Sequence, residues 1–429
     1  MMLETRTEKE KVIIVGVVLN NNSEETYDTL NELERLVNTA GGVVVAKVIQ
    51  ERKKIDPAYY IGKGKAEFVK QMCGMEYAGT VIFDEELSPA QVKNLEKIIN
   101  KKVIDRSGLI LDIFANNART KEAKTQVELA QLNYLLPRLT RRWTHLERQD
   151  GAIGLRGPGE TQLETDKRLI NNRIKKLKKE LAKIETQRNT RRKSRSEMFR
   201  ASLIGYTNSG KSTTMNLLTD ASVLVENKLF ATLDSTIKKL TFSDKSTLLL
   251  SDTVGFIKKL PHQLIASFKS TLEEVRESDI LIHVIDISHK NFREQIDTVN
   301  SVLHELQIND KLTINVFNKI DLLNDELKIK NVKEEFPEGV FISAKLGLGI
   351  QNLINSVHEI LSEQYFEGEF ILPDNFNEDI SKIYKVCDTV DIIRRKKCTK
   401  IKYRVRKELK DSILNELKKI TTEETVNCF

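Results

Sequence analysis

Apolar and polar stretches alternate along the first quarter of the chain in a pattern typical of strands and helices in turn. Val12–Leu19 is a continuous apolar run that predicts a strand, and Tyr27–Val37 has apolar residues at helical spacing. Gly41 and Gly42 end that helical pattern, and Val43–Ile49 predicts the next strand. Alternation of this kind favours an α/β domain.

The alternation continues beyond this point and then stops at a proline. Thr80–Phe83 predicts a short strand, after which Ser88 can cap, and Pro89 can open, a further helix. Val127–Leu136 and its flanks predict another helix, whose pattern breaks at Pro137. The sequence therefore predicts an N-terminal α/β domain followed by a helix that ends there.

A glycine-rich stretch separates this domain from a long amphipathic segment. Gly151–Gly159 contains four glycines in nine residues and cannot be regular structure. It is either a flexible connector or a loop that approaches a ligand, and Arg156 within it suits a phosphate. Thr161 and Glu164 then resemble a capping box. Apolar residues follow at heptad a and d positions, which predicts a helix packed on a neighbouring helix: Leu163, Ile170, Ile174, Leu177, Leu181 and Ile184.

Positive charge is concentrated on that segment. The chain has 429 residues and a formal net charge of +7 at pH 7, but Lys167–Arg195 alone has 13 basic residues and two acids. This local net of +11 leaves −4 for the rest of the chain. Concentrated positive charge is typical of a surface that binds a polyanion, although a solvated helix gives the same pattern. A second basic run, Arg394–Arg406, lies near the C-terminus.

The composition excludes several classes of protein. The sequence is 40% hydrophobic and 31% charged, as in globular proteins. Its longest apolar run is far shorter than the roughly 20 residues that span a bilayer, and its start lacks the apolar core of a signal peptide. The four cysteines have no metal-binding spacing, which favours a reducing compartment without structural zinc. We therefore expect a cytoplasmic protein, with at most a peripheral association with the membrane.

The strongest chemical signal lies at Gly205–Ser212, which has the pattern G-x-x-x-x-G-K-S. Phe199–Gly205 predicts a strand before it, and Thr213–Leu218 predicts a helix after it. In this pattern the backbone N–H groups turn inward around phosphates, Lys211 reaches the β- and γ-phosphates, and the Ser212 hydroxyl binds Mg²⁺. The flanking strand and helix make the pattern a strong prediction of a phosphate-binding loop.

Three further motifs follow at predicted strand ends, in the order found in GTP-binding proteins. Asp252 can hold Mg²⁺ through water, and the Gly255 N–H can contact the γ-phosphate. The carboxylate of Asp321 can accept two hydrogen bonds from guanine, whereas adenine would leave it unpaired. The backbone of Ser343–Lys345 can meet the guanine O6. Together these motifs predict a GTP-binding domain.

Two threonines are candidates for the switch residue that contacts the metal ion and the γ-phosphate. Thr232 is our choice for the hydroxyl that completes the Mg²⁺ shell and senses the γ-phosphate, with Thr236 as the alternative. Phe256 occupies the position where Ras-like GTPases have the glutamine that orients the attacking water. We therefore expect slow intrinsic hydrolysis, with a partner or an internal loop supplying the missing group, and we assign no general base.

These motifs define the expected site. Lys211, Thr232 and Gly255 have transition-state or switch roles, and Mg²⁺ is bound by Ser212, by Thr232 and, through water, by Asp252. The expected GTP-binding residues are Gly205, Tyr206, Thr207, Asn208, Ser209, Gly210, Lys211, Ser212, Phe230, Ala231, Thr232, Leu233, Asp234, Asp252, Thr253, Val254, Gly255, Asn318, Lys319, Asp321, Ser343, Ala344 and Lys345.

Eight segments together have a pattern specific enough to indicate a family: Tyr60–Lys65, Val81–Gln91, Val103–Phe114, Thr125–Leu139, Gly154–Thr165, Gly205–Thr213, Leu229–Asp234 and Asp252–Leu264. Through them the sequence resembles the HflX family of bacterial ribosome-associated GTPases from about Lys11 to Leu361. Ser209 stands where many members are expected to have alanine. The small C-terminal region matches only weakly.

The resemblance implies a monomeric GTPase that binds the large ribosomal subunit and, under stress, splits stalled ribosomes. It also implies that ribosomes stimulate GTP hydrolysis, that the N-terminal domain and basic arm face ribosomal RNA, and that Thr232 contacts Mg²⁺. The expected α/β architecture has four parts: residues 1–158 form the N-terminal α/β domain, 159–198 a basic helical arm, 199–363 a TRAFAC-type P-loop GTPase domain, and 364–429 a small α+β domain.

Other interpretations stay open from the residues alone. GTP could act mainly as a locking ligand with incidental turnover, which Phe256 leaves possible. An RNA-dependent ATPase is disfavoured by Asn318–Asp321. Gly62–Lys65 favours a basic turn over a second phosphate loop, and Trp143 favours a packed tryptophan over one that stacks on an RNA base.

Overall fold

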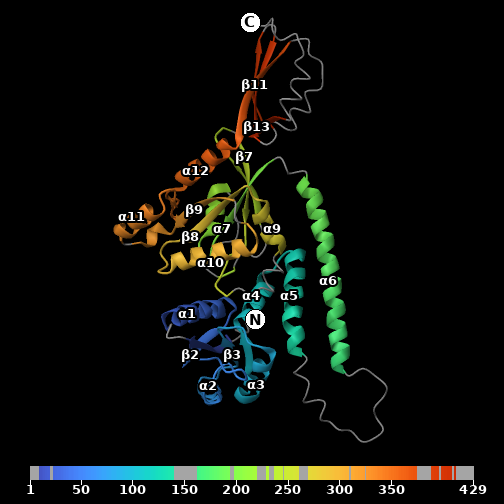
Figure 1. The fold of residues 1–429 in the computed structure, drawn as a ribbon, viewed down its shortest axis with the longest axis vertical. Helices are drawn as coiled ribbons and strands as arrows, with labels where there is room; N and C mark the ends of the chain where they lie inside the picture. Colours follow the sequence, from blue (N-terminus) through green and yellow to red (C-terminus); the bar gives the residue numbers. More distant parts are fainter. Residues whose placement is uncertain are drawn as a thin grey trace, which may run out of the picture.

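The computed structural model describes residues 9–19, 23–139, 162–193, 198–219, 229–230, 236–244, 246–259, 269–308, 311–323, 325–373, 388–395, 398–407 and 410–411. Three sheets follow one another along the chain, and a long pair of helices lies beside the first two (Figure 1). The predictions made for Trp143, Gly151–Gly159 and the capping box at Thr161 fall outside the described residues. Within the described parts of the chain, no helix is long and apolar enough to cross a membrane.

The first sheet is parallel, with strand order β2-β1-β3-β4. Helices cover both of its faces. The segment at Gly62–Lys65, expected to be a basic turn, instead opens α2 at Lys63. The elements are β1 (Lys11–Leu19), α1 (Ser23–Thr39), β2 (Val43–Arg52), α2 (Lys63–Met75), β3 (Thr80–Phe83), α3 (Pro89–Ile99), β4 (Lys102–Asp105) and α4 (Arg106–Asn117).

The position of β1 between two other strands, with helices on both faces, explains why its sequence is apolar without interruption. Val12 and Ile14 pack in the core beneath α1 and α4, while Ile13 and Val15 pack in the core beneath α2 and α3. A parallel strand that is buried on both faces has no polar side. The predicted α/β pattern is confirmed here. Ser88 caps α3 and Pro89 opens it as expected, and Gln91 completes a capping box with Ser88.

Two long helices connect this domain to the rest of the chain: α5 (Lys121–Leu139) and α6 (Gln162–Lys193). The apolar seam of α6 packs on α5, with Leu129, Ile174 and Leu177 buried together, so the predicted helix pair is confirmed. The expected end of α5 at Pro137 is wrong, because the helix continues to Leu139. Arg138 secures this last turn by donating to the Tyr134 carbonyl at 2.9 Å and to the Asp105 carboxylate at 2.8 Å.

The second sheet has six strands in the order β10-β9-β8-β5-β7-β6, all parallel to their neighbours except the edge strand β6. It forms the middle of the molecule (Figure 1). Its elements are β5 (Phe199–Ile204), α7 (Lys211–Thr219), β6 (Thr236–Thr241), β7 (Thr247–Asp252), α9 (Lys269–Glu277), β8 (Ile280–Asp286), α10 (Phe292–Glu305), β9 (Leu312–Asn318), η2 (Ile320–Leu322), α11 (Glu326–Glu335), β10 (Val340–Phe341) and α12 (Ile350–Glu363).

The third sheet lies at the far end of the molecule from the first (Figure 1). It is antiparallel, with the order β11-β13-β12, and consists of β11 (Tyr365–Pro373), β12 (Asp388–Arg395) and β13 (Cys398–Arg406). It supplies the sheet of the small C-terminal domain that the sequence predicts. The second basic run lies partly on β13, where Lys400 and Arg404 pair with Glu369 and Glu367 of β11.

Candidate functional site: a nucleotide-binding cleft

The phosphate-loop sequence connects β5 to α7 at the edge where the parallel strands end. Two of its glycines adopt backbone conformations that L side chains rarely adopt, with φ +146° at Gly205 and +100° at Gly210. A Cβ atom would lie 2.2 Å from the Val284 carbonyl oxygen at the first position and 2.2 Å from Asn318 Nδ2 at the second. Only glycine therefore fits where the loop is pressed against β8 and the end of β9.

Lys211 and Ser212 begin helix α7 directly beneath this loop. The Lys211 Nζ atom is buried and donates to the carbonyls of Gly205 at 3.1 Å and Tyr206 at 2.8 Å. Burial lowers the pKa of Lys211 to about 8, although the nearby Asp252 carboxylate opposes this shift. The Ser212 hydroxyl donates to Asp252 Oδ2 at 2.6 Å, which brings the two expected Mg²⁺ residues together from α7 and β7.

The loop is suited to an anion and an accompanying hard cation. The hydroxyls of Thr207 and Ser209 are buried and make no hydrogen bond with any described residue, so both remain available to a ligand. Backbone N–H groups at the start of α7 favour negative charge. A serine hydroxyl beside a carboxylate provides the oxygen ligands that Mg²⁺ prefers. These donors fit a phosphate group together with Mg²⁺.

The predicted base-recognition segments meet the phosphate loop through Asn318. Its Nδ2 donates to the Ser209 carbonyl at 2.8 Å, and its Oδ1 accepts from the Ala344 N–H at 2.9 Å. The Ser343 hydroxyl donates to Asp321 Oδ1 at 2.6 Å, which orients the carboxylate expected to bind guanine. Lys319 Nζ forms an ion pair with Asp286 Oδ2 at 2.6 Å. The structure thus brings three separate motifs of the sequence to one edge of the sheet.

The expected switch residues are only partly described. Phe230 is buried, packs against Phe114 of α4 with ring centroids 4.7 Å apart, and its carbonyl accepts from Asn117 Nδ2 at 2.7 Å. Ala231, Thr232, Leu233 and Asp234 lie outside the described residues. The alternative, Thr236, is the first residue of β6 and pairs with Asp252 across the sheet.

We term residues 252–259 switch II, and this segment lies directly against the phosphate loop. The Phe256 N–H donates to the Gly205 carbonyl at 3.1 Å, and the Thr207 N–H donates to the Phe256 carbonyl at 2.8 Å. A Cβ atom on Gly255 would be only 3.1 Å from Lys211 Nζ. The Phe256 side chain is 2% exposed, so it packs in the core and offers no polar group to a water molecule.

Helix α1 of the first domain contributes to the same cleft, which the sequence did not reveal. A cavity of about 840 Å³ is lined by the phosphate loop, by Lys319 and by one face of α1, including Glu32 and Arg35. Glu32 also accepts a hydrogen bond from the Tyr206 hydroxyl at 2.6 Å. The sequence signal that could have pointed to this contact is Arg106, a charged residue at the start of the apolar run of α4; its guanidinium is paired with Glu32.

Four features together define a P-loop GTPase: a sheet that is parallel except for its edge strand β6, a glycine-rich phosphate loop that opens a helix, an aspartate at the neighbouring strand end, and an Asn-Lys-x-Asp segment. Comparisons with known proteins agree. Residues 200–319 match the family described as a 50S ribosome-binding GTPase, and residues 27–115 and 117–195 match the N-terminal and middle regions of GTP-binding GTPases.

Similar proteins share most of this chain's length. GTPase HflX of Escherichia coli is 44% identical over 380 residues, which cover 88% of this chain and 89% of that protein. GTPase HflX of Flavobacterium psychrophilum is 54% identical over 322 residues, or 75% and 78% of the two chains. The chain belongs to the HflX family of GTPases, and its reaction is the hydrolysis of GTP.

One solved structure of lower similarity is a GTP-binding protein from the archaeon Sulfolobus solfataricus in complex with GDP. It is 26% identical, with a TM-score of 0.45, and the match covers 82% of this chain and 99% of that protein.

Proposed function

We propose that this GTPase binds the large ribosomal subunit and dissociates stalled or stressed ribosomes, and that the ribosome stimulates its GTP hydrolysis. The observation that carries the proposal is the exposed basic face of α6. Its apolar seam is used for packing on α5, while Lys175, Lys176, Lys178 and Lys179 all face solvent. An exposed row of lysines suits the phosphates of ribosomal RNA.

The other basic run suits RNA less well. On β13, Lys400 pairs with Glu369 at 2.7 Å, and Arg404 pairs with Asp244 at 2.6 Å. These partners neutralise the charges of Lys400 and Arg404, so the exposed row of lysines on α6 is the better candidate for the RNA contact. The family description, a 50S ribosome-binding GTPase, supports the same partner. We place this activity in the cytoplasm and in a monomer.

For the nucleotide site we propose that Mg²⁺ is required and is bound by Ser212 and Thr232, with Asp252 acting through water. Lys211 and the Gly255 N–H would stabilise the charge that develops on the γ-phosphate. Asp321 would select guanine. The 2.6 Å contact between Ser212 and Asp252 and the bridging role of Asn318 support this assignment. The proposed domain limits are those expected from the sequence, at residues 158, 198 and 363.

The proposal predicts a low basal rate of GTP turnover that rises steeply with added large ribosomal subunits. The physical reason is Phe256, because its buried ring leaves the water-positioning role to a partner. Turnover of the full-length chain would be measured with and without purified subunits, using small subunits as the control. A rate that ignores large subunits would contradict the coupling while leaving the GTP site intact.

A second candidate function is a ribosome-binding protein that GTP locks in place, with incidental turnover. The same buried Phe256 favours it. The two candidates differ in what hydrolysis does, so subunit separation would be followed by light scattering with GTP and with a non-hydrolysable analogue. If both nucleotides support the same number of rounds of ribosome splitting, hydrolysis is not needed, which would favour the locking role. If the analogue supports one round of splitting and GTP supports many, hydrolysis is needed for each new round, which would favour a hydrolytic cycle.

A further inference from the structure

Thr207, the third residue of the phosphate loop, has a buried hydroxyl without a partner. The residue is 6% exposed, and its Oγ1 atom makes no hydrogen bond with any described residue. Leaving a buried hydroxyl unpaired costs stability, so a partner is expected when the site is filled. Ser209 has a similar hydroxyl, but of the two residues only Thr207 lines the cavity of about 840 Å³. We therefore expect the partner of Thr207 to be a molecule that enters this cleft.

Thr207 lies next to two groups that bind the γ-phosphate in the proposed nucleotide site. A Cβ atom on Gly255 would be 2.8 Å from the Thr207 Cα, 2.9 Å from its Cγ2 and 3.1 Å from Lys211 Nζ. Lys211 Nζ and the Gly255 N–H are the groups that we assign to the γ-phosphate. On the basis of that proposed site, Thr207 lies beside the γ-phosphate of bound GTP.

Two contacts hold the Thr207 side chain in one orientation. The Thr207 N–H donates to the Phe256 carbonyl at 2.8 Å, which fixes its backbone. Its Cγ2 methyl lies against Gly255, and a β-branched side chain has few rotamers available. Because the methyl occupies the position that faces Gly255, the hydroxyl has to take another staggered position on Cβ. The hydroxyl is therefore already oriented before a nucleotide binds.

A threonine hydroxyl has the hydrogen-bonding groups that are needed to orient a water molecule. It has one O–H donor and two acceptor lone pairs, so it can accept from a water molecule while it donates to a γ-phosphate oxygen. Phe256 occupies the position of the glutamine in Ras-like GTPases, and its buried side chain has no such group. Thr207 is therefore suited to take over part of the role of that glutamine.

We propose that Thr207 is a catalytic residue whose hydroxyl orients the attacking water during GTP hydrolysis. The water oxygen forms a bond to the γ-phosphorus, and the bond from the γ-phosphorus to the β–γ bridging oxygen breaks. GDP leaves with the electron pair of the broken bond, and both water protons end on the product H₂PO₄⁻, while Thr207 keeps its own proton. One neutral hydroxyl is a weak substitute for a glutamine, which agrees with the low basal rate expected above and leaves a ribosomal partner to complete the site.

The test compares Thr207→Val with the wild type in the full-length chain, by the single-turnover rate at which bound GTP is hydrolysed without ribosomes. Valine keeps a methyl group against Gly255 and removes the hydroxyl. We expect the rate to fall at least about tenfold, with unchanged dissociation constants for GDP and for a non-hydrolysable GTP analogue. Thr125→Val is the matched control and should leave the rate unchanged, since Thr125 is also 6% exposed and lies on α5. An unchanged rate in Thr207→Val would overturn the proposal.

Two further measurements separate catalysis from binding and from folding. Thr207→Ser keeps the hydroxyl, so it should hydrolyse GTP faster than Thr207→Val; equal rates in the two variants would contradict the proposal. GDP with aluminium fluoride mimics the transition state, so Thr207→Val should bind this mixture more weakly than the wild type does. If the variant weakens binding of the non-hydrolysable analogue by the same factor, Thr207 contributes only to binding and is not catalytic. No ribosomes are present in these measurements, so the results do not depend on the proposed ribosomal partner.

Discussion

His283 is a buried titratable residue near the phosphate loop, in the middle of β8 and 2% exposed. Burial, together with the positive charge of Lys211, lowers its pKa to about 4. The unfolded chain takes up this proton near pH 6.5. Between those values the unfolded state binds more protons, so stability falls as the pH decreases through this window.

We therefore predict that protonation of His283 in the unfolded state lowers the free energy of unfolding by about 2 kcal/mol between pH 7 and pH 5. The variant His283→Gln lacks this titration and should lose that much less stability over the same range. Urea unfolding of both proteins at the two pH values would measure the difference. Equal losses in both proteins would mean that His283 is protonated in the folded state.

Asp321 is the residue expected to set the base specificity. The Ser343 hydroxyl orients its carboxylate by donating a hydrogen bond to one of the two oxygens. Asp321→Asn replaces an acceptor with a donor, so the preference for GTP over xanthosine triphosphate should fall at least about 100-fold. Competition binding with the two nucleotides would measure it. Asp325→Asn is the control, since Asp325 caps α11 by accepting from the Leu327 N–H; a similar change there would show that the base site is misplaced.

At the residue scale, a site residue could be predicted from the sequence only when its partners lie close to it along the chain. The phosphate loop is a contiguous segment, so its glycines and Lys211 could be found from local spacing. Glu32 could not, because the hydroxyl that it binds lies 174 residues away on Tyr206. Nothing in the local pattern of α1 distinguishes that glutamate from its solvated neighbours.

At the scale of elements, the pairing of α5 with α6 depends on a narrow apolar seam. Leu177 is 1% exposed within that seam, whereas Leu169 on the same helix is 59% exposed. Leu177→Ala should reduce the stability of the helix pair by about 2–5 kcal/mol, and Leu169→Ala by much less. Hydrogen exchange along α6 in both variants would show the difference. Equal effects would indicate that α6 does not depend on α5.

The order of elements could be predicted from periodicity, but helix ends could not. Strand β1 and helix α1 were expected within a few residues of their bounds, because both are buried and strongly patterned. The continuation of α5 beyond Pro137 depends on Arg138, whose partners are Asp105 and the Leu87 carbonyl in other parts of the fold. Such distant contacts override a local helix-breaking signal.

At the scale of the whole molecule, the proposed RNA contact should depend strongly on salt, since neutralised phosphates release counterions. Lys175→Gln with Lys179→Gln on α6 should lower the slope of log affinity against log salt by about 0.7–0.9 for each phosphate that the variant no longer neutralises. Binding to a ribosomal RNA fragment would be titrated at several salt concentrations. The control pair is Lys330→Gln with Lys333→Gln on α11; a slope equal to that of the α6 pair would contradict a specific role for α6.

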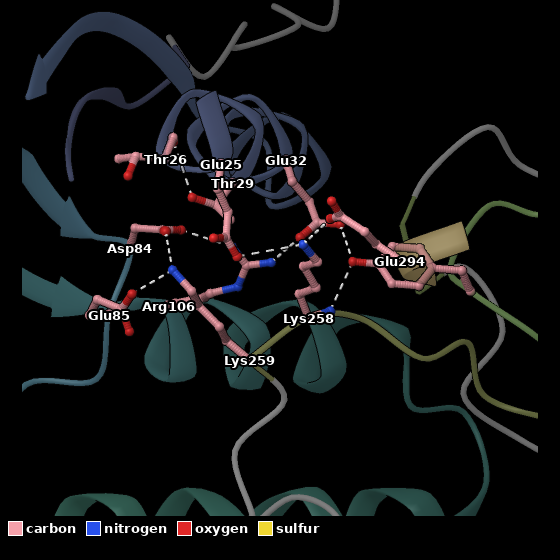
Figure 2. Close-up of polar contacts among 11 residues, drawn as sticks. Glu25, Thr26, Thr29, Glu32, Asp84, Glu85, Arg106, Lys258, Lys259 and Glu294 are labelled. Carbon is pink, nitrogen blue, oxygen red and sulfur yellow. Dashed lines mark hydrogen bonds and ion pairs between the residues drawn. The ribbon is translucent and has the colours of Figure 1, made fainter. Parts of the chain in front are cut away.

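The order of synthesis has a consequence for the ion pairs that Lys259 forms with Asp84 and Glu85 of the first domain (Figure 2). Asp84 and Lys259 are 175 residues apart, so the first domain is complete long before its lysine partners are synthesised. During that interval Glu32 and Asp84 share the Arg106 guanidinium, and neither Asp84 nor Glu85 has its Lys259 partner, so the nascent surface carries excess negative charge. Such a surface repels the phosphates of RNA near the tunnel exit. Synthesis order would thus keep an unfinished chain off the nucleic acid that the finished protein is proposed to bind.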